Sequence, residues 1–175
     1  YGDEITLFLL DQGADINTAS QDGVTTLMEA LRYYPNPDFI QLLLDNGANV
    51  NAANKWKMTP LMYAAETKSI SIYKALLEKG ADPSCVDIDG CNALYYLVKA
   101  SFDTNDKINV EEIIELLPQD PSSLKIVDSE TGNSILYHAA RNGYLDLVKT
   151  ILNSEVAINI LNHKGETPII IACKR

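Results

Sequence analysis

The chain has 175 residues, of which 46% are hydrophobic and 22% charged. This length fits one compact domain or a short repeat array, and the apolar content is typical of a folded chain rather than a disordered one. No apolar run approaches the roughly 18–20 residues that cross a bilayer, so no membrane insertion is expected. The first ten residues contain acids and no basic segment, which excludes a signal peptide.

The net charge of −10 excludes nucleic acid as an expected partner, because phosphate binding needs a basic face. A protein partner with a basic surface would complement this charge, although excess acid also simply keeps a protein soluble.

The cysteines are few and odd in number: Cys85, Cys91 and Cys173, with no CxxC pair. This pattern indicates a reducing, intracellular compartment, with the cytoplasm favoured and the nucleus as the alternative. Cys85 and Cys91 could share a metal ion, but neither His138 nor His163 lies near them in sequence. Ordinary thiols are the favoured interpretation, and no metal or other cofactor is expected.

Two markers recur along the chain. One is a Leu-rich run that ends in a Gly-Ala-acid/amide turn, with successive glycines 34 and 33 residues apart; it reads LLDQGADIN at 9–17, LLDNGANVN at 43–51 and LLEKGADPS at 76–84. A degenerate copy at 151–159, ILNSEVAIN, has Glu155 in the glycine position. The other marker recurs at steps of 34, 33, 42 and 33; it reads TTLMEAL from Thr25, TPLMYAA from Thr59, NALYYLV from Asn92, SILYHAA from Ser134 and TPIIIAC from Thr167.

These markers predict pairs of helices. Thr at the start of each first helix can cap free N–H groups, and Pro60 and Pro168 then occupy the first helical position, which needs no N–H. Small residues follow at 64–65 and 139–140, where neighbouring helices can approach closely. The second helices have apolar residues at spacings of three and four, namely Ile40, Leu43 and Leu44, then Ile72, Leu76 and Leu77, then Val110, Ile113, Ile114 and Leu117.

Glycines mark the expected turns. Gly13, Gly47 and Gly80 fall where a helix C-terminus needs the left-handed conformation. Asp22-Gly23 and Asp89-Gly90 are tight-turn dipeptides, which we expect at the tips of loops.

Both markers resemble the ankyrin repeat, in which a DG turn precedes a TPLHxAA helix and a second helix ends in LL and GADVN. The match is good from Thr59 to Asp82 and from Ala139 to Val148, and the resemblance covers essentially the whole chain. It implies an all-α solenoid of stacked helix-turn-helix units with β-hairpin or loop fingers. The expected repeats are 21–54, 55–87, 88–128 and 129–162, with partial repeats at 1–20 and 163–175, all within a single domain 1–175.

The ends resemble interrupted repeats, with a second helix at Glu4 to Asp11 and a first helix at Ile169 to Ile171. Since terminal repeats usually have a polar outer face, we expect a piece of a longer array, or else an end that pairs with another copy.

Several departures from the family pattern are informative. The usual His of TPLH is replaced by Met28, Met62, Tyr95, Tyr137 and Ile170, so its hydrogen bond to the neighbouring finger must be replaced or lost. His138, one position later, is expected to be partly buried and hydrogen-bonded, which is favoured over a catalytic or pH-sensing role.

The long third repeat carries a polar insertion at 101–109, which predicts a surface loop, and Pro118 should end its second helix near Leu117.

Tyr33 and Tyr34 precede two prolines and either pack internally or face a ligand. Trp56 is the only tryptophan and lies at an expected finger tip, where it either contacts a partner or packs on the next finger.

The resemblance implies that a partner binds the concave face formed by fingers and first helices. The family's variable positions project onto a mixed aromatic, basic and acidic stripe made of Asp22, Val24, Arg32, Tyr33, Lys55, Trp56, Met58, Glu66, Ile88, Asp89, Lys99, Glu130, Asn133 and Arg141. Further candidates on the same stripe are Gln21, Cys91, Thr131, His163, Lys164 and Glu166.

No catalytic motif of the GxGxxG, P-loop, GxSxG or HExxH type occurs, so an enzyme is not expected. The predicted function is a protein–protein interaction scaffold or adaptor. The alternative is a recruiting or regulatory ankyrin domain of a larger enzyme, channel or pathogen effector. The sequence leaves the oligomeric state open.

Overall fold

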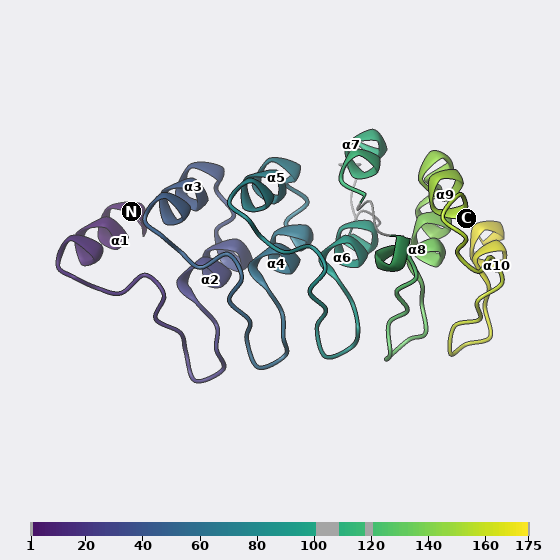
Figure 1. Ribbon diagram of the computed structural model, residues 1–175, viewed down its shortest axis with the longest axis horizontal. Coiled ribbons are helices and arrows are strands. Elements are labelled where there is room, and N and C mark those ends of the chain that lie inside the picture. Colours follow the sequence, from purple (N-terminus) through teal and green to yellow (C-terminus); the bar gives the residue numbers. More distant parts are fainter. Residues whose placement is uncertain (1, 101–108, 118–120, 175) are drawn as a thin grey trace. The chain divides into compact units, whose positions relative to one another are not determined.

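The computed structural model describes residues 2–100, 109–117 and 121–174 (Figure 1). They form two compact units, Tyr1–Asp82 (unit 1) and Pro83–Arg175 (unit 2), and each is described by itself. The described helices of unit 1 are α1 (Gly2–Asp11), α2 (Thr26–Tyr33), α3 (Pro37–Asp45), α4 (Pro60–Glu66) and α5 (Ile70–Glu78). Those of unit 2 are α6 (Ala93–Ala100), α7 (Val110–Glu115), the 3₁₀ turn η1 (Pro121–Leu124), α8 (Ile135–Asn142), α9 (Leu145–Leu152) and α10 (Pro168–Cys173).

Each unit has two layers of helices. In unit 1, α2 packs on α4 in one layer and α3 packs on α5 in the other, while α2–α3 and α4–α5 join the layers. In unit 2, α8 packs between α6 and α10, α7 packs on α9, and α8–α9 joins the layers. The predicted all-α fold of helix-turn-helix units is confirmed, and Figure 1 shows long loops that extend from the ends of the first helices.

We call these loops fingers; they span 20–25, 54–59, 87–92, 128–134 and 162–167. Within the described residues they contain no strand, and only the isolated bridges Ala19–Thr25 and Val127–Ser134 carry β pairing. The fingers are therefore loops rather than regular hairpins. Residues 101–108 of the insertion predicted at 101–109 lie outside the described residues, as does Pro118; α7 ends at Glu115.

Most of the apolar positions predicted for the second helices lie in the core of their unit, whereas Leu77, Val110, Ile114 and Leu117 are only half-buried. Ile40, Leu43, Ile72 and Leu76 are at most 1% exposed, and Ile113 of α7 is fully buried. Burying each such side chain contributes about 1.5–3 kcal/mol. The small residues behave as expected, since Ala64, Ala65 and Ala139 are fully buried where the first helices pack together.

The left-handed turns are confirmed, including those that lack glycine. Gly47 and Gly80 have φ of 85° and 86° at the ends of α3 and α5. Lys57, at the tip of a finger, and Glu155, in the degenerate turn, have φ of 59° and 55°. The repeat geometry therefore imposes this conformation even on residues whose Cβ disfavours it.

The capping prediction holds only where no proline follows the cap residue. The side chains of Thr25, Asn92 and Ser134 accept the N–H three residues on, at 3.4, 2.9 and 3.1 Å. Thr59 and Thr167, which precede Pro60 and Pro168, make no such bond. Of the three threonines that could cap a first helix, Thr25 therefore does so, whereas Pro60 and Pro168 occupy the first position of the other two helices.

Asparagines tie successive turns together in unit 1. Asn17 donates to the Gly47 carbonyl at 3.0 Å and accepts the Asn49 N–H at 2.7 Å. One repeat later, Asn51 donates to the Gly80 carbonyl and accepts the Asp82 N–H, both at 2.9 Å. Each amide therefore fixes the register of one repeat on the next.

Fingers are also joined by their backbones. The N–H of Lys55 donates to the Asp22 carbonyl at 2.9 Å in unit 1. In unit 2 the N–H of Ser129 donates to Asp89, and that of His163 to Thr131, at 3.0 and 2.9 Å.

Replacing Asn51 by Ala removes both amide bonds to the next turn, so we expect the free energy of unfolding of unit 1 to fall by about 1–2 kcal/mol. Urea denaturation followed by Trp56 fluorescence measures this change. The control is Gln41→Ala, whose side chain bonds only to Asp45 within α3, and which should change stability by less than about 0.5 kcal/mol. Equal effects of the two substitutions would contradict the role given to Asn51.

Gly132 and Gly165 offer a matched test of finger contact, because both have φ of 72°. A Cβ on Gly132 would lie 2.8 Å from His163 Cδ2 and 2.9 Å from its backbone nitrogen, whereas one on Gly165 would meet nothing within 4 Å. Gly165→Ala should cost about 1–2 kcal/mol from backbone strain, and Gly132→Ala about 1–3 kcal/mol more from the clash. Thermal unfolding compares them; identical losses would mean that the two fingers are not in contact in solution.

Candidate protein-binding face

A short polar side chain at the base of each finger organises the loop that follows. Asn54 Oδ1 accepts the N–H groups of Trp56 and Met58, both at 3.0 Å. The same two-and-four pattern recurs at Asp87 and Asn162, at 2.9 Å throughout. Asn54, Asp87, Asp128 and Asn162 are all at most 7% exposed, so these bonds are protected from water.

Tyrosines connect the first helices to these bases. Tyr63 OH accepts Asn54 Nδ2 at 3.0 Å, and Tyr96 OH donates to Asp87. Tyr95 OH reaches Asp128 in the following finger at 3.1 Å.

The hydrogen bond of the missing family histidine is replaced where a tyrosine stands in its place. Tyr95 reaches Asp128, and Tyr137 OH donates to Glu166 in the following finger at 3.2 Å. Met62 instead contacts the start of its own helix, where its sulfur accepts the Thr59 N–H at 3.4 Å. Thr59 Oγ1 is buried and has no hydrogen-bond partner among the described residues.

His138 is only 2% exposed and lies edge-on to Tyr95 and Tyr137. Its Nε2 is 3.0 Å from Tyr95 OH. Because Tyr95 donates its own proton to Asp128, the imidazole must donate from Nε2, which leaves Nδ1 as a buried acceptor without a partner in the described structure. His138 is thus more deeply buried than predicted, and is hydrogen-bonded at one nitrogen.

The charge states in this network follow from burial. Burial, reinforced by the positive charges of Lys99 and Arg141, lowers the pKa of His138 to about 4, so the ring is neutral near pH 7. Burial would raise the pKa of Asp128, but hydrogen bonds from Thr131, the Glu130 N–H and Tyr95 together hold it below its usual value.

In unit 1 the predicted stripe contains a compact cluster at two finger tips. Lys55 Nζ lies 2.7 Å from Asp22 Oδ1 and 4.3 Å from the ring centre of Trp56. Trp56 keeps 38% of its surface exposed. The cluster is therefore an exposed aromatic ring held beside an ion pair; partner contact by Trp56 remains a prediction.

The two adjacent tyrosines of the proline-rich loop behave differently. Tyr34 packs edge-to-face on Phe39, with ring centres 5.8 Å apart. Tyr33 is 71% exposed and lies 5.3 Å from the Arg32 guanidinium carbon. Tyr34 therefore packs on Phe39 through one edge but stays 51% exposed, so both tyrosines present surface to solvent.

In unit 2 the stripe residues lie at the tip of the finger at 87–92, at Lys99 of α6, and in a pocket between two fingers. Ile88 is 56% exposed at a finger tip, and Asp89 accepts both the N–H and the hydroxyl of Ser129 at 3.0 Å. Lys99 lies over the rings of Tyr95 and Tyr96 at 5.7 and 5.8 Å.

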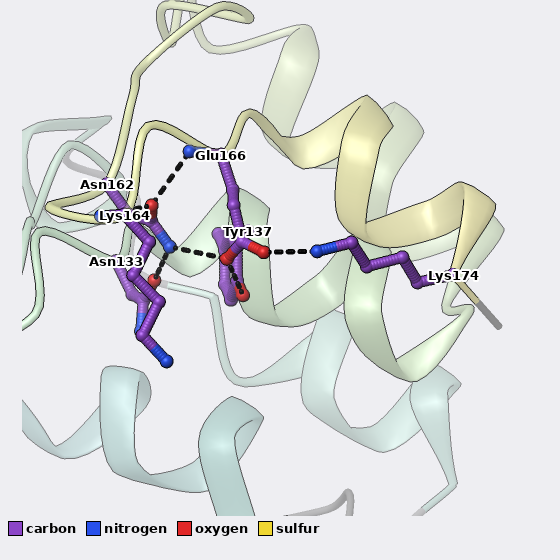
Figure 2. Close-up of polar contacts among 6 residues, drawn as sticks. All are labelled: Asn133, Tyr137, Asn162, Lys164, Glu166 and Lys174. Carbon is purple, nitrogen blue, oxygen red and sulfur yellow. Dashed lines mark hydrogen bonds and ion pairs between the residues drawn. The ribbon is translucent and has the colours of Figure 1, made fainter.

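Glu130, Asn133 and Arg141 line one shared pocket of about 450 Å³ in unit 2. The pocket is bounded by the fingers at 128–134 and 162–167 together with α8 and α10. Figure 2 shows polar side chains from both fingers and Tyr137 of α8 close together, with Lys174, which follows α10, reaching Glu166. The further candidates Thr131, His163, Lys164 and Glu166 line the same pocket.

None of the fourteen residues predicted for the face is buried, but the further candidate Cys91 is only 2% exposed, so its placement on the face is wrong. Their charges balance, with cations Arg32, Lys55, Lys99 and Arg141 against acids Asp22, Glu66, Asp89 and Glu130. The excess negative charge of the chain therefore belongs to other residues, and these fourteen predicted residues do not themselves require a basic partner.

Sequence reasoning missed the finger bases and the bonds of Tyr137 and Lys174. Acid or amide residues at 54, 87, 128 and 162 recur at 33, 41 and 34 residues, a spacing that could have identified them. Lys174, paired with Glu166 at 2.5 Å, carried no such signal.

Within the described residues no group of three or more His, Cys, Asp or Glu side chains could hold a metal ion. No helix there is long and apolar enough to cross a membrane.

Stacked helix pairs with finger loops define a helical repeat protein. The sequence matches the family description "Ankyrin repeats (3 copies)" over residues 1–87 and 97–175. The chain belongs to the ankyrin repeat family, whose domains are generally protein–protein interaction modules and typically non-catalytic.

The buried histidine predicts a loss of stability in acid. Its folded pKa of about 4 lies below the ordinary histidine pKa of 6.5, so the unfolded chain binds more protons between these pH values. This contribution is fully present above about pH 6.5 and should fall by about 3 kcal/mol as the pH drops to 4. Urea denaturation from pH 4 to 7 of the wild type, His138→Gln and the control His163→Gln measures it. Only His138→Gln should flatten the slope, and an unchanged slope would contradict the burial argument.

Proposed function

We propose that this chain is a scaffold or adaptor that binds a partner protein on the face formed by its fingers and first helices. The carrying observation is that exposed aromatic rings stand on this face beside cations, at Trp56 with Lys55 and at Tyr33 with Arg32. Aromatic and arginine side chains are enriched among residues that dominate binding energy. Their burial against a partner removes apolar area from water without any change in the helices beneath.

Rigid fingers support the same proposal. The tip residues are held by hydrogen bonds to a buried base, as at Asn54, and by the backbone bond from Lys55 to the preceding finger. A surface that is ordered before binding loses less conformational entropy on association.

The balanced charges of the face favour a partner of mixed charge, whereas the net charge of −10 favours a basic protein at longer range and disfavours nucleic acid. The odd cysteine count supports an intracellular setting.

The test compares proteins captured from a lysate of the source organism by the tagged wild-type chain and by a Trp56→Ala, Tyr33→Ala variant. Loss of both rings should weaken specific capture at least tenfold, or about 1.4 kcal/mol. The control is Phe8→Ala, Leu145→Ala, which removes comparably exposed side chains from helices outside the predicted face.

Circular dichroism and thermal unfolding establish that each variant stays folded. Quantitative mass spectrometry should show a set of proteins depleted from the face variant and retained by the control. Equal retention by both variants would refute the assignment of this face.

A further inference from the structure

The finger at 54–59 differs from the other fingers at its tip. Gly23, Gly90, Gly132 and Gly165 occupy the tip position of the other four fingers, with φ between 72° and 78°. Lys57 occupies this position here, with φ of 59°. A residue with a Cβ is strained in the left-handed region, whereas glycine is not. Lys57 is therefore a less stable choice than glycine for the backbone of this turn.

Hydrogen bonds fix the conformation of the tip. The N–H of Lys57 donates to the Asn54 carbonyl at 2.8 Å, and that of Asn54 donates to the Met58 carbonyl at 3.1 Å. The finger at 87–92 has the same pair of bonds, with Gly90 at its tip, at 3.2 and 3.0 Å. The turn thus forms in the same way with glycine or with lysine, so it does not need the lysine side chain.

The Lys57 side chain is the surplus positive charge of the tip. It is exposed and makes no hydrogen bond or ion pair with the described residues. Lys55, in contrast, is neutralised by Asp22 at 2.7 Å and lies 4.3 Å from the ring centre of Trp56. Lys57 directly follows Trp56, which is 38% exposed. Backbone strain that no contact of the described chain offsets is typical of a residue with a role in binding.

We propose that Lys57 binds the carboxylate of an Asp or Glu side chain of the partner protein, whose neighbouring apolar residue packs on Trp56. The ammonium supplies the opposing charge and three donors, and the ring supplies apolar area. At physiological salt, charges farther away than about 8 Å are largely screened, so the net charge of −10 does not prevent this contact. This inference rests on the proposed function and adds the chemistry of one contact.

The test follows the indole N–H signal of Trp56, the only tryptophan, in the full chain labelled with ¹⁵N. The probes are N-acetyl-Leu-Glu-amide, N-acetyl-Leu-Gln-amide and N-acetyl-Leu-Lys-amide at matched ionic strength. The glutamate probe should shift the signal in a saturable manner and bind about threefold more tightly than the glutamine probe, the size expected of an exposed ion pair. The lysine probe should bind more weakly than either.

Variants of the lysine separate charge from backbone strain. Lys57→Gln should abolish the preference for glutamate, and Lys57→Arg should keep it. Lys125→Gln, which makes the same charge change at an exposed lysine of unit 2, should leave the preference unaltered. Lys57→Gly should abolish the preference and raise the folding equilibrium constant about threefold, because glycine adopts the left-handed conformation without strain.

Equal affinities for the three probes, no saturable shift with the glutamate probe, or a preference that survives Lys57→Gln would each overturn the proposal. So would a Lys57→Gly variant that is less stable than the wild type, since the lysine would then stabilise the turn. These outcomes are separable from failure of the proposed function, because the capture experiment changes Trp56 and Tyr33 and keeps Lys57. Loss of capture there with no glutamate preference here would leave the scaffold role intact and refute the carboxylate contact alone.

Discussion

The buried acid or amide at the base of the four fingers that begin at Asn54, Asp87, Asp128 and Asn162 is the constraint on which the proposed binding face depends. A finger is a loop of six or seven residues without regular strands, so its backbone N–H groups need other partners. Asn54, Asp87 and Asn162 meet that need with one oxygen each, bonded two and four residues ahead. The second polar atom of Asn54 bonds to Tyr63, and that of Asp87 bonds to Tyr96. Because both tyrosines belong to first helices, these bonds connect the finger loops to the packed helices.

The same network explains how the chain tolerates losing the usual histidine. A phenol is longer than an imidazole, and Tyr95 and Tyr137 reach acids in the following finger. Where methionine stands instead, no such bond forms, and Met62 contributes burial in its place. Stacking in unit 1 then relies on the Asn17 and Asn51 amides, which bind the next turn directly. The repeats thus hold together by different polar contacts over a similar apolar core.

Much of the fold could be predicted from the sequence because its signals are local. The period of the glycines fixed the left-handed turns, and apolar spacing identified Ile40, Leu43, Ile72 and Leu76 as core. The pocket and the His138 contacts could not be predicted, because they join residues 29 to 43 positions apart whose side-chain directions depend on how the repeats stack. The sequence also did not indicate that the buried Thr59 hydroxyl, which precedes Pro60, has no hydrogen-bond partner among the described residues.

Hydrogen exchange at the tip of the finger at 54–59 tests the central claim most directly. An Asn54→Leu variant keeps a side chain of similar size and removes the oxygen that accepts from Trp56 and Met58. The account predicts that these two amides lose at least tenfold in protection, while amides in the core of α5, such as Leu76, keep theirs. Unchanged protection at Trp56 and Met58 would show that something other than the finger base orders the loop, and would contradict the account.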